Sequence, residues 1–171
     1  MYKRQGLDVK SMSETSTKVF ILEVMGRHAG WIAAASALAA RNETDPPHII
    51  LMPEVPFAKK KFINKVKQTV ANEGFCVVVA SEGTRYKNGM FLADSGLTDA
   101  FGHKQLGGVA PVLAQMISSI GLKNHWAVSD YLQRSARHIS SKTDLDQAYA
   151  VGKKAVEFAL AGKNAVMPVI K

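Results

Sequence analysis

The sequence predicts an α/β fold in three layers, an open parallel sheet with helices on both of its faces. Short apolar segments alternate with amphipathic segments along most of the 171 residues. The apolar segments are rich in β-branched residues and show little alternation with polar ones, which is typical of parallel strands buried on both faces. Turn-forming residues separate most segments from the next. Because the strands are parallel, we expect right-handed crossovers between them.

The first half of the chain predicts strand, helix, strand, helix and strand in that order. Each predicted strand is a short apolar run, and each predicted helix carries apolar residues at helical spacing. Asn42 and the following DPP end the first helix, and Gly74 ends the second. The predicted elements are 19–25, 29–42, 48–52, 59–73 and 75–81.

The second half begins with a polar, glycine-bearing stretch, 82–102, which predicts a long loop with or without a short hairpin. Loops of this length in compact domains are often functional. A helix, a strand, an irregular stretch, a helix that Asp144 caps, and a last strand follow. Their predicted bounds are 106–120, 126–130, 131–143, 144–161 and 164–170. No linker or repeat interrupts the pattern, so we interpret residues 1–171 as a single domain.

Composition indicates a soluble protein of a reducing compartment. Apolar residues make up 47% and charged residues 21% of the chain, which are ordinary globular values. No apolar run is long enough to cross a membrane, and the first twenty residues are too polar for a secretory signal. Cys76 is the only cysteine, so no internal disulfide forms, and its apolar surroundings predict a buried thiol. We therefore expect a cytoplasmic protein without membrane partners.

The net charge of +8 suits either nucleic acid or a small phosphorylated anion as a partner. The densest basic cluster, 59–61, opens a predicted helix and has no interleaved aromatic residues, which favours a solvated helix face. The five histidines show no metal-ligand spacing with cysteines or acids, so we predict no metal site made by histidines. The charge pattern alone thus does not favour nucleic acid.

Residues that could bind a ligand follow three of the predicted strands. In an open parallel sheet, ligands bind beyond the carboxyl ends of the strands, which share one edge. We therefore expect a ligand site that combines residues from three separate segments. These residues are Met25, Gly26 and Arg27 after the first strand, Glu82 after the third, and Tyr131 and Arg134 after the fourth.

The turn after the first strand has features of an anion site. Gly26 permits a tight turn, and a helix that begins near residue 29 points its unpaired amides back at it. Arg27 adds a forked cation, which binds either a phosphate or a structural carboxylate. Glu23, inside the strand, is interpreted as a buried structural carboxylate that pairs with a lysine or a backbone amide.

The other strand ends leave two interpretations open. The Glu82 carboxylate either accepts hydrogen bonds from two sugar hydroxyls or forms a salt bridge with Arg85 or Lys87. Tyr131 and Arg134 offer donors that suit a phosphate, although each of them taken singly is typical of a surface position.

Several motifs together resemble the phosphofructokinase family, above all its pyrophosphate-dependent members. The segments are EVMGRHAGW, MPEVPF, VVVASEGTRY, GHKQLGGVAP and SDYLQRSARHISSKTD, in this order from about Ser11 to Ile170. The resemblance implies the Rossmann-like, sugar-phosphate-binding half of the phosphofructokinase fold.

The resemblance also implies roles for the residues at the strand ends. Fructose 6-phosphate would contact the first turn, where Arg27 would also stabilise the charge on the transferring phosphoryl group. Glu82 would hold sugar hydroxyls, and the residues after the fourth strand would bind the 6-phosphate. The implied substrate-binding residues are Met25, Gly26, Arg27, Glu82, Tyr131 and Arg134.

Two departures from the family pattern matter. Tyr131 stands where many relatives have histidine, and tyrosine fits the pyrophosphate-type branch. Lys18 stands where arginine is common; by position, it would reach the sugar site of a neighbouring subunit. A further basic contact would be Lys123 or His125.

The implied reaction is glycolytic transfer of a phosphoryl group from pyrophosphate or ATP to the 1-hydroxyl of fructose 6-phosphate. Positioning and charge stabilisation by cations and Mg²⁺ dominate such transfers. The family's catalytic aspartate motif, Thr-Ile-Asp-Asn-Asp, and its glycine-rich donor loop do not occur in this sequence. We therefore expect a chain truncated at both ends, without the Mg²⁺ ligands, that binds the sugar phosphate weakly and turns nothing over. The family also implies a homo-oligomer.

Two other functions stay open. A non-catalytic sugar-phosphate sensor built on the same half would bind ligand without turnover. A basic nucleic-acid-binding module would show steeply salt-dependent binding to generic DNA. The module ranks last, because the lysines are spread over several predicted helices and no recognition motif appears.

Overall fold

A computed structural model describes residues 10–13, 16–98, 104–106 and 108–171. The chain divides into two compact units, Met1–Asp130 and Tyr131–Lys171, and each is described by itself. The interpretation of residues 1–171 as a single domain stays a prediction.

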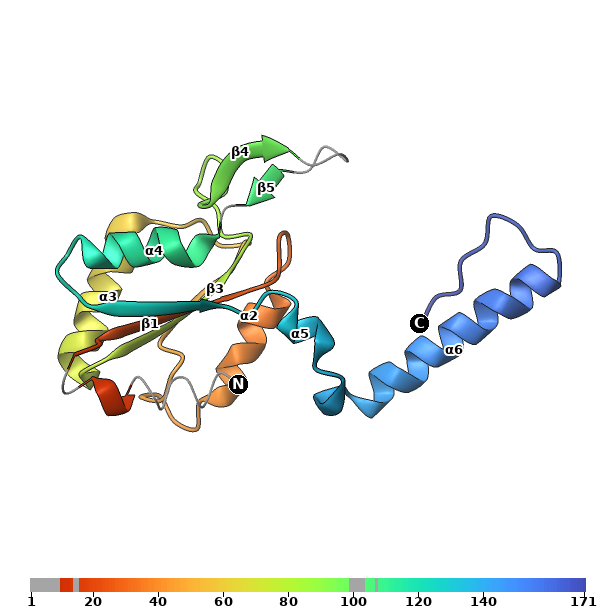
Figure 1. The fold of residues 1–171 in the computed structure, drawn as a ribbon, viewed down its shortest axis with the longest axis horizontal. Coiled ribbons are helices and arrows are strands. Elements are labelled where there is room, and N and C mark those ends of the chain that lie inside the picture. The colour runs from red at the N-terminus through yellow and green to blue at the C-terminus, as the bar shows by residue number, and fades with distance from the viewer. Residues whose placement is uncertain (1–9, 14–15, 99–103, 107) are drawn as a thin grey trace. The chain divides into compact units, whose positions relative to one another are not determined.

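The first unit contains the predicted parallel sheet. Its strand order is β2-β3-β1-β6, and all three pairings are parallel (Figure 1). The two central strands, β1 and β3, are buried along their whole lengths, as their apolar sequences predict. The strands are β1 (Val19–Val24), β2 (Ile49–Leu51), β3 (Cys76–Ser81) and β6 (Asn124–Val128).

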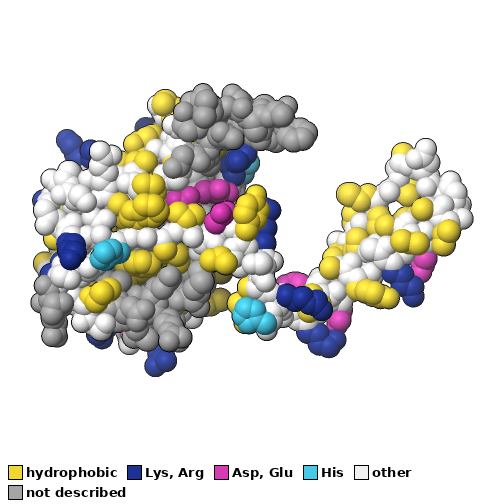
Figure 2. Space-filling model, in the orientation of Figure 1, with side chains coloured by type: hydrophobic (Ala, Val, Ile, Leu, Met, Phe, Trp, Pro, Cys, Tyr) yellow, Lys and Arg dark blue, Asp and Glu magenta, His cyan; other side chains and the backbone are white. Residues whose placement is uncertain are grey.

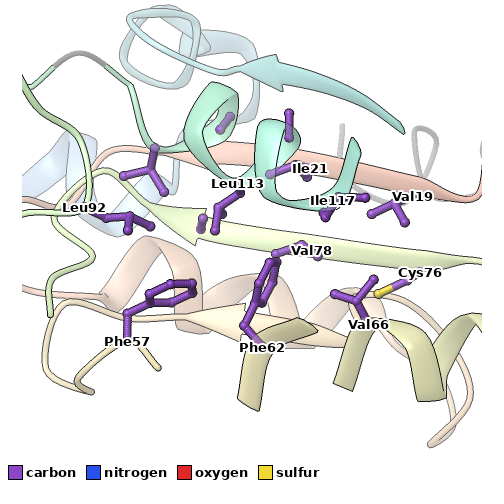
Figure 3. Packing of buried hydrophobic residues seen from close by; sticks show 14 of the residues in the cluster. Val19, Ile21, Phe57, Phe62, Val66, Cys76, Val78, Leu92, Leu113 and Ile117 are labelled. Atoms are coloured by element: carbon purple, nitrogen blue, oxygen red, sulfur yellow. The ribbon is translucent and has the colours of Figure 1, made fainter. Parts of the chain in front are cut away.

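Helices cover both faces of this sheet, so the predicted three-layer arrangement is confirmed. On one face, α3 (Lys59–Glu73) and α4 (Val109–Ser118) pack on β1 and β3. Figure 3 shows Leu113 and Ile117 of α4 and Phe62 of α3 in this cluster. On the other face, α2 (Trp31–Ala35) contributes Ala33 to a smaller cluster with alternate residues of β1 and β3.

Two predicted helices of the first unit differ from the observed ones. The helix expected over 29–42 is a short α2 followed by the 3-10 helix η1 (Ser36–Ala39). The helix expected from residue 106 begins instead at Val109, after Gly108 with φ +95°. The residues before it belong to β5 (Lys104–Leu106), which pairs antiparallel with β4 (Asp94–Thr98). The stretch 82–102 therefore contains one strand of a short antiparallel pair, and the second strand lies just beyond the predicted bounds.

The second unit consists of α5 (Leu132–Ser135), the 3-10 helix η2 (Arg137–Ile139) and α6 (Lys142–Leu160). The predicted cap Asp144 is wrong. Ser141 is the N-cap, and its hydroxyl accepts a hydrogen bond at 3.4 Å from the Asp144 N–H, as N-cap serines do. Asp144 lies in the first turn, where its charge favours the helix dipole.

The predicted last strand over 164–170 is also wrong, because this stretch is irregular. A strand needs a partner for its backbone groups, and the described residues of the second unit include no other strand.

No residue of α6 is buried, and its Tyr149 and Leu160 are 76% and 85% exposed. Figure 2 shows hydrophobic side chains on the surface of this helix. Among the described helices, none is both long and apolar enough to cross a membrane.

Candidate functional site

The turns that follow β1 and β3 begin level with each other at one edge of the sheet. Val24 is paired with Ser81 in the parallel register, and the Glu82 N–H donates to the Val24 carbonyl at 2.9 Å. The segments that begin at Met25 and Glu82 therefore leave the sheet side by side. This confirms that the structure brings the first and third predicted strand ends together.

Side chains at the end of β3 and just after it hold consecutive backbone groups of the turn that follows β1. The Glu82 Oε1 accepts from the Gly26 N–H at 3.2 Å, and the Ser81 hydroxyl donates to the Gly26 carbonyl. One residue further, Nη2 of Arg85 donates to the Arg27 carbonyl at 3.2 Å. Three side chains from one segment thus fix the backbone that carries Arg27.

Glycine is required on both sides of this contact. Gly26 has φ +139°, and a Cβ there would lie 2.6 Å from the Ala29 carbonyl oxygen. A Cβ on Gly83 would lie 2.0 Å from the carbonyl oxygen of Arg27, which is closer than any real contact. The two turns therefore pack backbone against backbone, which no other residue type permits.

Glu82 is half-buried beside the first turn, and the salt-bridge alternative for it is wrong. Within the described residues, Arg85 and Lys87 form no ion pair with Glu82, and Arg85 donates to the backbone carbonyl of Arg27 instead. A carboxylate has two oxygens and about four acceptor positions. One contact with Gly26 therefore leaves acceptor capacity at this position for hydroxyl groups.

The start of α2 differs from the predicted anion site. The helix begins at Trp31, and the N–H of the preceding Gly30 donates to Oε1 of Glu54 at 2.7 Å. A carboxylate of the protein itself thus occupies this short helix terminus, so the amides predicted to bind phosphate are not all available. Glu54, which follows β2, was not predicted, because a side-chain bond to a distant backbone amide leaves no sequence signal.

Glu23 is a buried carboxylate bonded to backbone amides, so the amide alternative is confirmed. Its Oε2 accepts from the Ala110 N–H, at the start of α4, at 2.8 Å. Burial raises the pKa of Glu23, and the negative charges of Glu82 and Asp130 raise it further, whereas the amides of Ala110 and Val109 lower it. Glu23 therefore ties the start of α4 to the sheet below the candidate site.

Lys18 and the other basic candidates lie at the opposite ends of the strands. The Lys18 ammonium donates to the carbonyl of Ser13, and its backbone N–H donates to the Lys123 carbonyl at 2.9 Å. His125 is an exposed residue of β6, paired with Phe20. The role of Lys18, Lys123 or His125 in a sugar site of a neighbouring subunit stays a prediction.

Tyr131 and Arg134 belong to the second unit. The Arg134 guanidinium carbon lies 5.2 Å from the centre of the Tyr131 ring, which is cation–π distance, and both side chains are exposed. Their predicted convergence with Arg27 and Glu82 stays a prediction.

No group of three or more histidine, cysteine, aspartate or glutamate side chains that could hold a metal ion occurs among the described residues. His103, one of the five histidines weighed as ligands, lies outside that part of the chain.

Comparison with known proteins gives consistent matches. The model of the family described as phosphofructokinase matches residues 7–159. A pyrophosphate–fructose 6-phosphate 1-phosphotransferase of Halomonas elongata is 65% identical over 166 residues, which is 96% of this chain and 40% of that protein. The Xanthomonas campestris protein of the same name is 58% identical over 99% of this chain and 41% of its own length.

A solved structure is similar as well. The crystal structure of a pyrophosphate-dependent phosphofructokinase from Marinobacter aquaeolei aligns with a TM-score of 0.78 at 57% identity. The alignment covers 99% of this chain and 39% of that one. The chain thus spans about 40% of the length of the curated relatives it matches.

Proposed function

Because the chain belongs to the phosphofructokinase family, we propose that it forms the fructose 6-phosphate-binding part of a pyrophosphate-dependent 6-phosphofructokinase. The whole enzyme would transfer a phosphoryl group from pyrophosphate to the 1-hydroxyl of fructose 6-phosphate in glycolysis. ATP is the alternative donor. Pyrophosphate is favoured by the names of the relatives that are 58% and 65% identical.

One observation carries the proposal: hydrogen bonds hold the turns after β1 and β3 together. The Gly26 N–H donates to Glu82, and the Arg27 carbonyl accepts from Arg85, so the turn that carries Arg27 lies against the segment that carries Glu82 at the carboxyl ends of the strands. That edge is where open parallel sheets bind ligands. The opposite charges there suit a sugar phosphate, with hydroxyls for the carboxylate and phosphoryl oxygens for the guanidinium.

We assign roles on this basis. Met25 and Gly26 shape the turn against which the sugar lies, and Glu82 accepts from its hydroxyls. Arg27 balances negative charge as the phosphoryl group is transferred, which is the main chemical task in such reactions. Tyr131 and Arg134 bind the 6-phosphate.

Other parts of the reaction need residues beyond these. Phosphoryl transfer uses Mg²⁺, and the described residues form no cluster of histidine, cysteine or acidic side chains that would hold it. We also propose a cytoplasmic homo-oligomer in which Lys18 contributes to a neighbouring sugar site. By itself the chain would bind fructose 6-phosphate weakly and would not turn it over.

Chemical-shift titration of the ¹⁵N-labelled chain with fructose 6-phosphate tests the proposal. We expect the amides of Gly26, Arg27 and Glu82 to shift, and Arg27→Met to weaken binding at least about tenfold, the equivalent of one charged hydrogen bond. Lys87→Met is the matched control, because Lys87 is an exposed cation on the segment after β3 that also carries Glu82. Fructose is the ligand control for the phosphate.

The outcomes separate the parts of the proposal. Equal weakening by Arg27→Met and Lys87→Met, or shifts confined to other segments, would contradict the assigned site. A coupled assay for fructose 1,6-bisphosphate with pyrophosphate and Mg²⁺ tests the expected lack of activity. Turnover by the pure chain would overturn that expectation while supporting the reaction.

A further inference from the structure

Arg85 contacts the first turn although it lies on another segment and none of the roles above includes it. Its Nη2 is 3.2 Å from the Arg27 carbonyl oxygen and 3.3 Å from Nδ1 of His28. Both acceptors belong to the turn that carries the proposed phosphoryl-binding guanidinium. A single side chain thus contacts two successive residues of that turn.

Arg85 is itself fixed by its surroundings. Its carbonyl accepts from the Phe57 N–H at 2.7 Å, and its backbone forms an antiparallel bridge with Phe91. The guanidinium carbon lies 5.0 Å from the centre of the Phe91 ring, within the range of a cation–π contact. Backbone hydrogen bonding and the contact with the Phe91 ring therefore restrict the position of Arg85, and with it the geometry of its contacts with the turn after β1.

The contact with Arg27 completes the restraint of that turn. Ser81 and Glu82 bind the carbonyl and the N–H of Gly26, and Arg85 binds the next carbonyl along the chain. With these groups fixed, the backbone from which the Arg27 side chain extends has little rotational freedom. Such restraint matters because misplacement of a charge-stabilising group by about 1 Å costs about a hundredfold in rate.

The contact with His28 favours one tautomer of the neutral ring. An arginine has only donors, so Nδ1 of His28 accepts and its ring proton lies on Nε2. The His28 ring also lies against Phe91, with ring centres 6.1 Å apart. Arg85 and Phe91 together therefore hold both the tautomer and the orientation of His28 beside the site.

We propose that Arg85 is a positioning residue, which sets the direction of the Arg27 side chain and the tautomer of His28. The inference rests on the proposed function, because it concerns how the same sugar-phosphate site is built. Arginine suits the task better than lysine, since one planar group stacks on a ring while its N–H groups reach two acceptors.

A double-mutant cycle separates positioning from general structural support. Affinity for fructose 6-phosphate is measured by chemical-shift titration for Arg85→Met, Arg27→Met and the double variant. If Arg85 acts through Arg27, Arg85→Met weakens binding about tenfold in the wild-type background and less than about twofold when Arg27 is already methionine. Equal weakening in both backgrounds, or none in either, overturns the proposal.

Two further variants refine the cycle. Lys87→Met removes a cation from the same segment that has no contact with Arg27, so it should change the affinity by less than about twofold. If Arg85 acted only through its long-range charge, Lys87→Met would weaken binding as much as Arg85→Met does. Arg85→Lys keeps one ammonium group that can donate hydrogen bonds, so it should bind fructose 6-phosphate more tightly than Arg85→Met does. No recovery beyond Arg85→Met would count against a hydrogen-bonded role.

A measurement without ligand tests the inference even if Arg27→Met binds too weakly to titrate. It also applies if the chain binds no fructose 6-phosphate, a result that would contradict the proposed function but not the role of Arg85. Long-range ¹H–¹⁵N spectra at alkaline pH report which ring nitrogen of His28 carries the proton. We expect Nε2 to be protonated in the wild type and in Lys87→Met, and a mixture of tautomers in Arg85→Met. An unchanged His28 spectrum in Arg85→Met overturns the inference.

Discussion

Glu23 places a carboxylate in the buried strand β1, and hydrogen bonding to amides at the start of α4 compensates in part for its lost hydration. Burial is the largest cause of its raised pKa, which lies above the ordinary 4.5. The folded protein therefore binds this proton more tightly than the unfolded chain does. Its stabilising contribution is complete below the unfolded pKa and is lost as the pH rises through the folded pKa.

The variant Glu23→Gln tests this sign. Glutamine keeps an oxygen for the Ala110 N–H but carries no charge, so the decline in unfolding free energy above pH 4.5 should become smaller than in the wild type. Urea unfolding over a pH series measures it. Glu43→Gln, at an exposed position of the first unit, is the control and should keep the wild-type slope. A slope unchanged in Glu23→Gln would contradict the assignment.

At the scale of elements, the contact between the turns after β1 and β3 depends on Gly83. An alanine Cβ there would lie 2.0 Å from the Arg27 carbonyl oxygen, and backbone atoms cannot move aside as a flexible side chain does. We expect Gly83→Ala to lower the unfolding free energy by about 1–3 kcal/mol, as overpacking does, and to weaken fructose 6-phosphate binding. Chemical denaturation and titration measure the two effects.

Gly152→Ala provides the control for this substitution. Gly152 lies in α6, where an added Cβ meets nothing within 4 Å, and alanine favours helix. We expect this variant to be no less stable than the wild type. If Gly83→Ala behaved like Gly152→Ala, the close approach of the two turns would not exist in solution.

The elements that the sequence predicted well are those with local causes. Runs of β-branched residues indicated β1 and β3, and Gly74 with φ +82° ends α3 as predicted. The missed features depend on distant partners. The stretch 164–170 is apolar enough for a strand but has no neighbouring strand in its unit, and the local rule for caps did not separate Ser141 from Asp144.

In the candidate site, too, the features with local causes were predicted and those that depend on distant partners were missed. Strand-end position predicted that the turns after β1 and β3, which carry Arg27 and Glu82, lie side by side, because parallel strands share an edge. The roles of Glu54 and Arg85 were not predicted, since each binds backbone groups of a segment far away in the sequence. Side-chain bonds to backbone amides and carbonyls impose no residue type on the partner, so a single sequence carries no trace of them.

At the scale of the whole molecule, the buried core belongs to the first unit. Both hydrophobic clusters are formed by residues between Val19 and Ala127, whereas α6 has no buried residue. The ion pairs of α6, such as Lys142–Asp146, are exposed, and pairs of this kind contribute only about 0.3–0.5 kcal/mol. Among the described residues, the hydrophobic core thus lies entirely within the first unit.

A chain that ends at Asp130 should consequently stay folded and yet lose its ligand. Because about 1 kcal/mol shifts Tm by about 2–8 °C in domains of this size range, we expect Tm to change by no more than that. The same truncation removes Tyr131 and Arg134, so affinity for fructose 6-phosphate should fall at least about tenfold if they bind the 6-phosphate. Calorimetry and titration of the two chains measure both effects. Unaltered affinity would remove Tyr131 and Arg134 from the proposed site, and loss of cooperative unfolding would show that the first unit does not fold by itself.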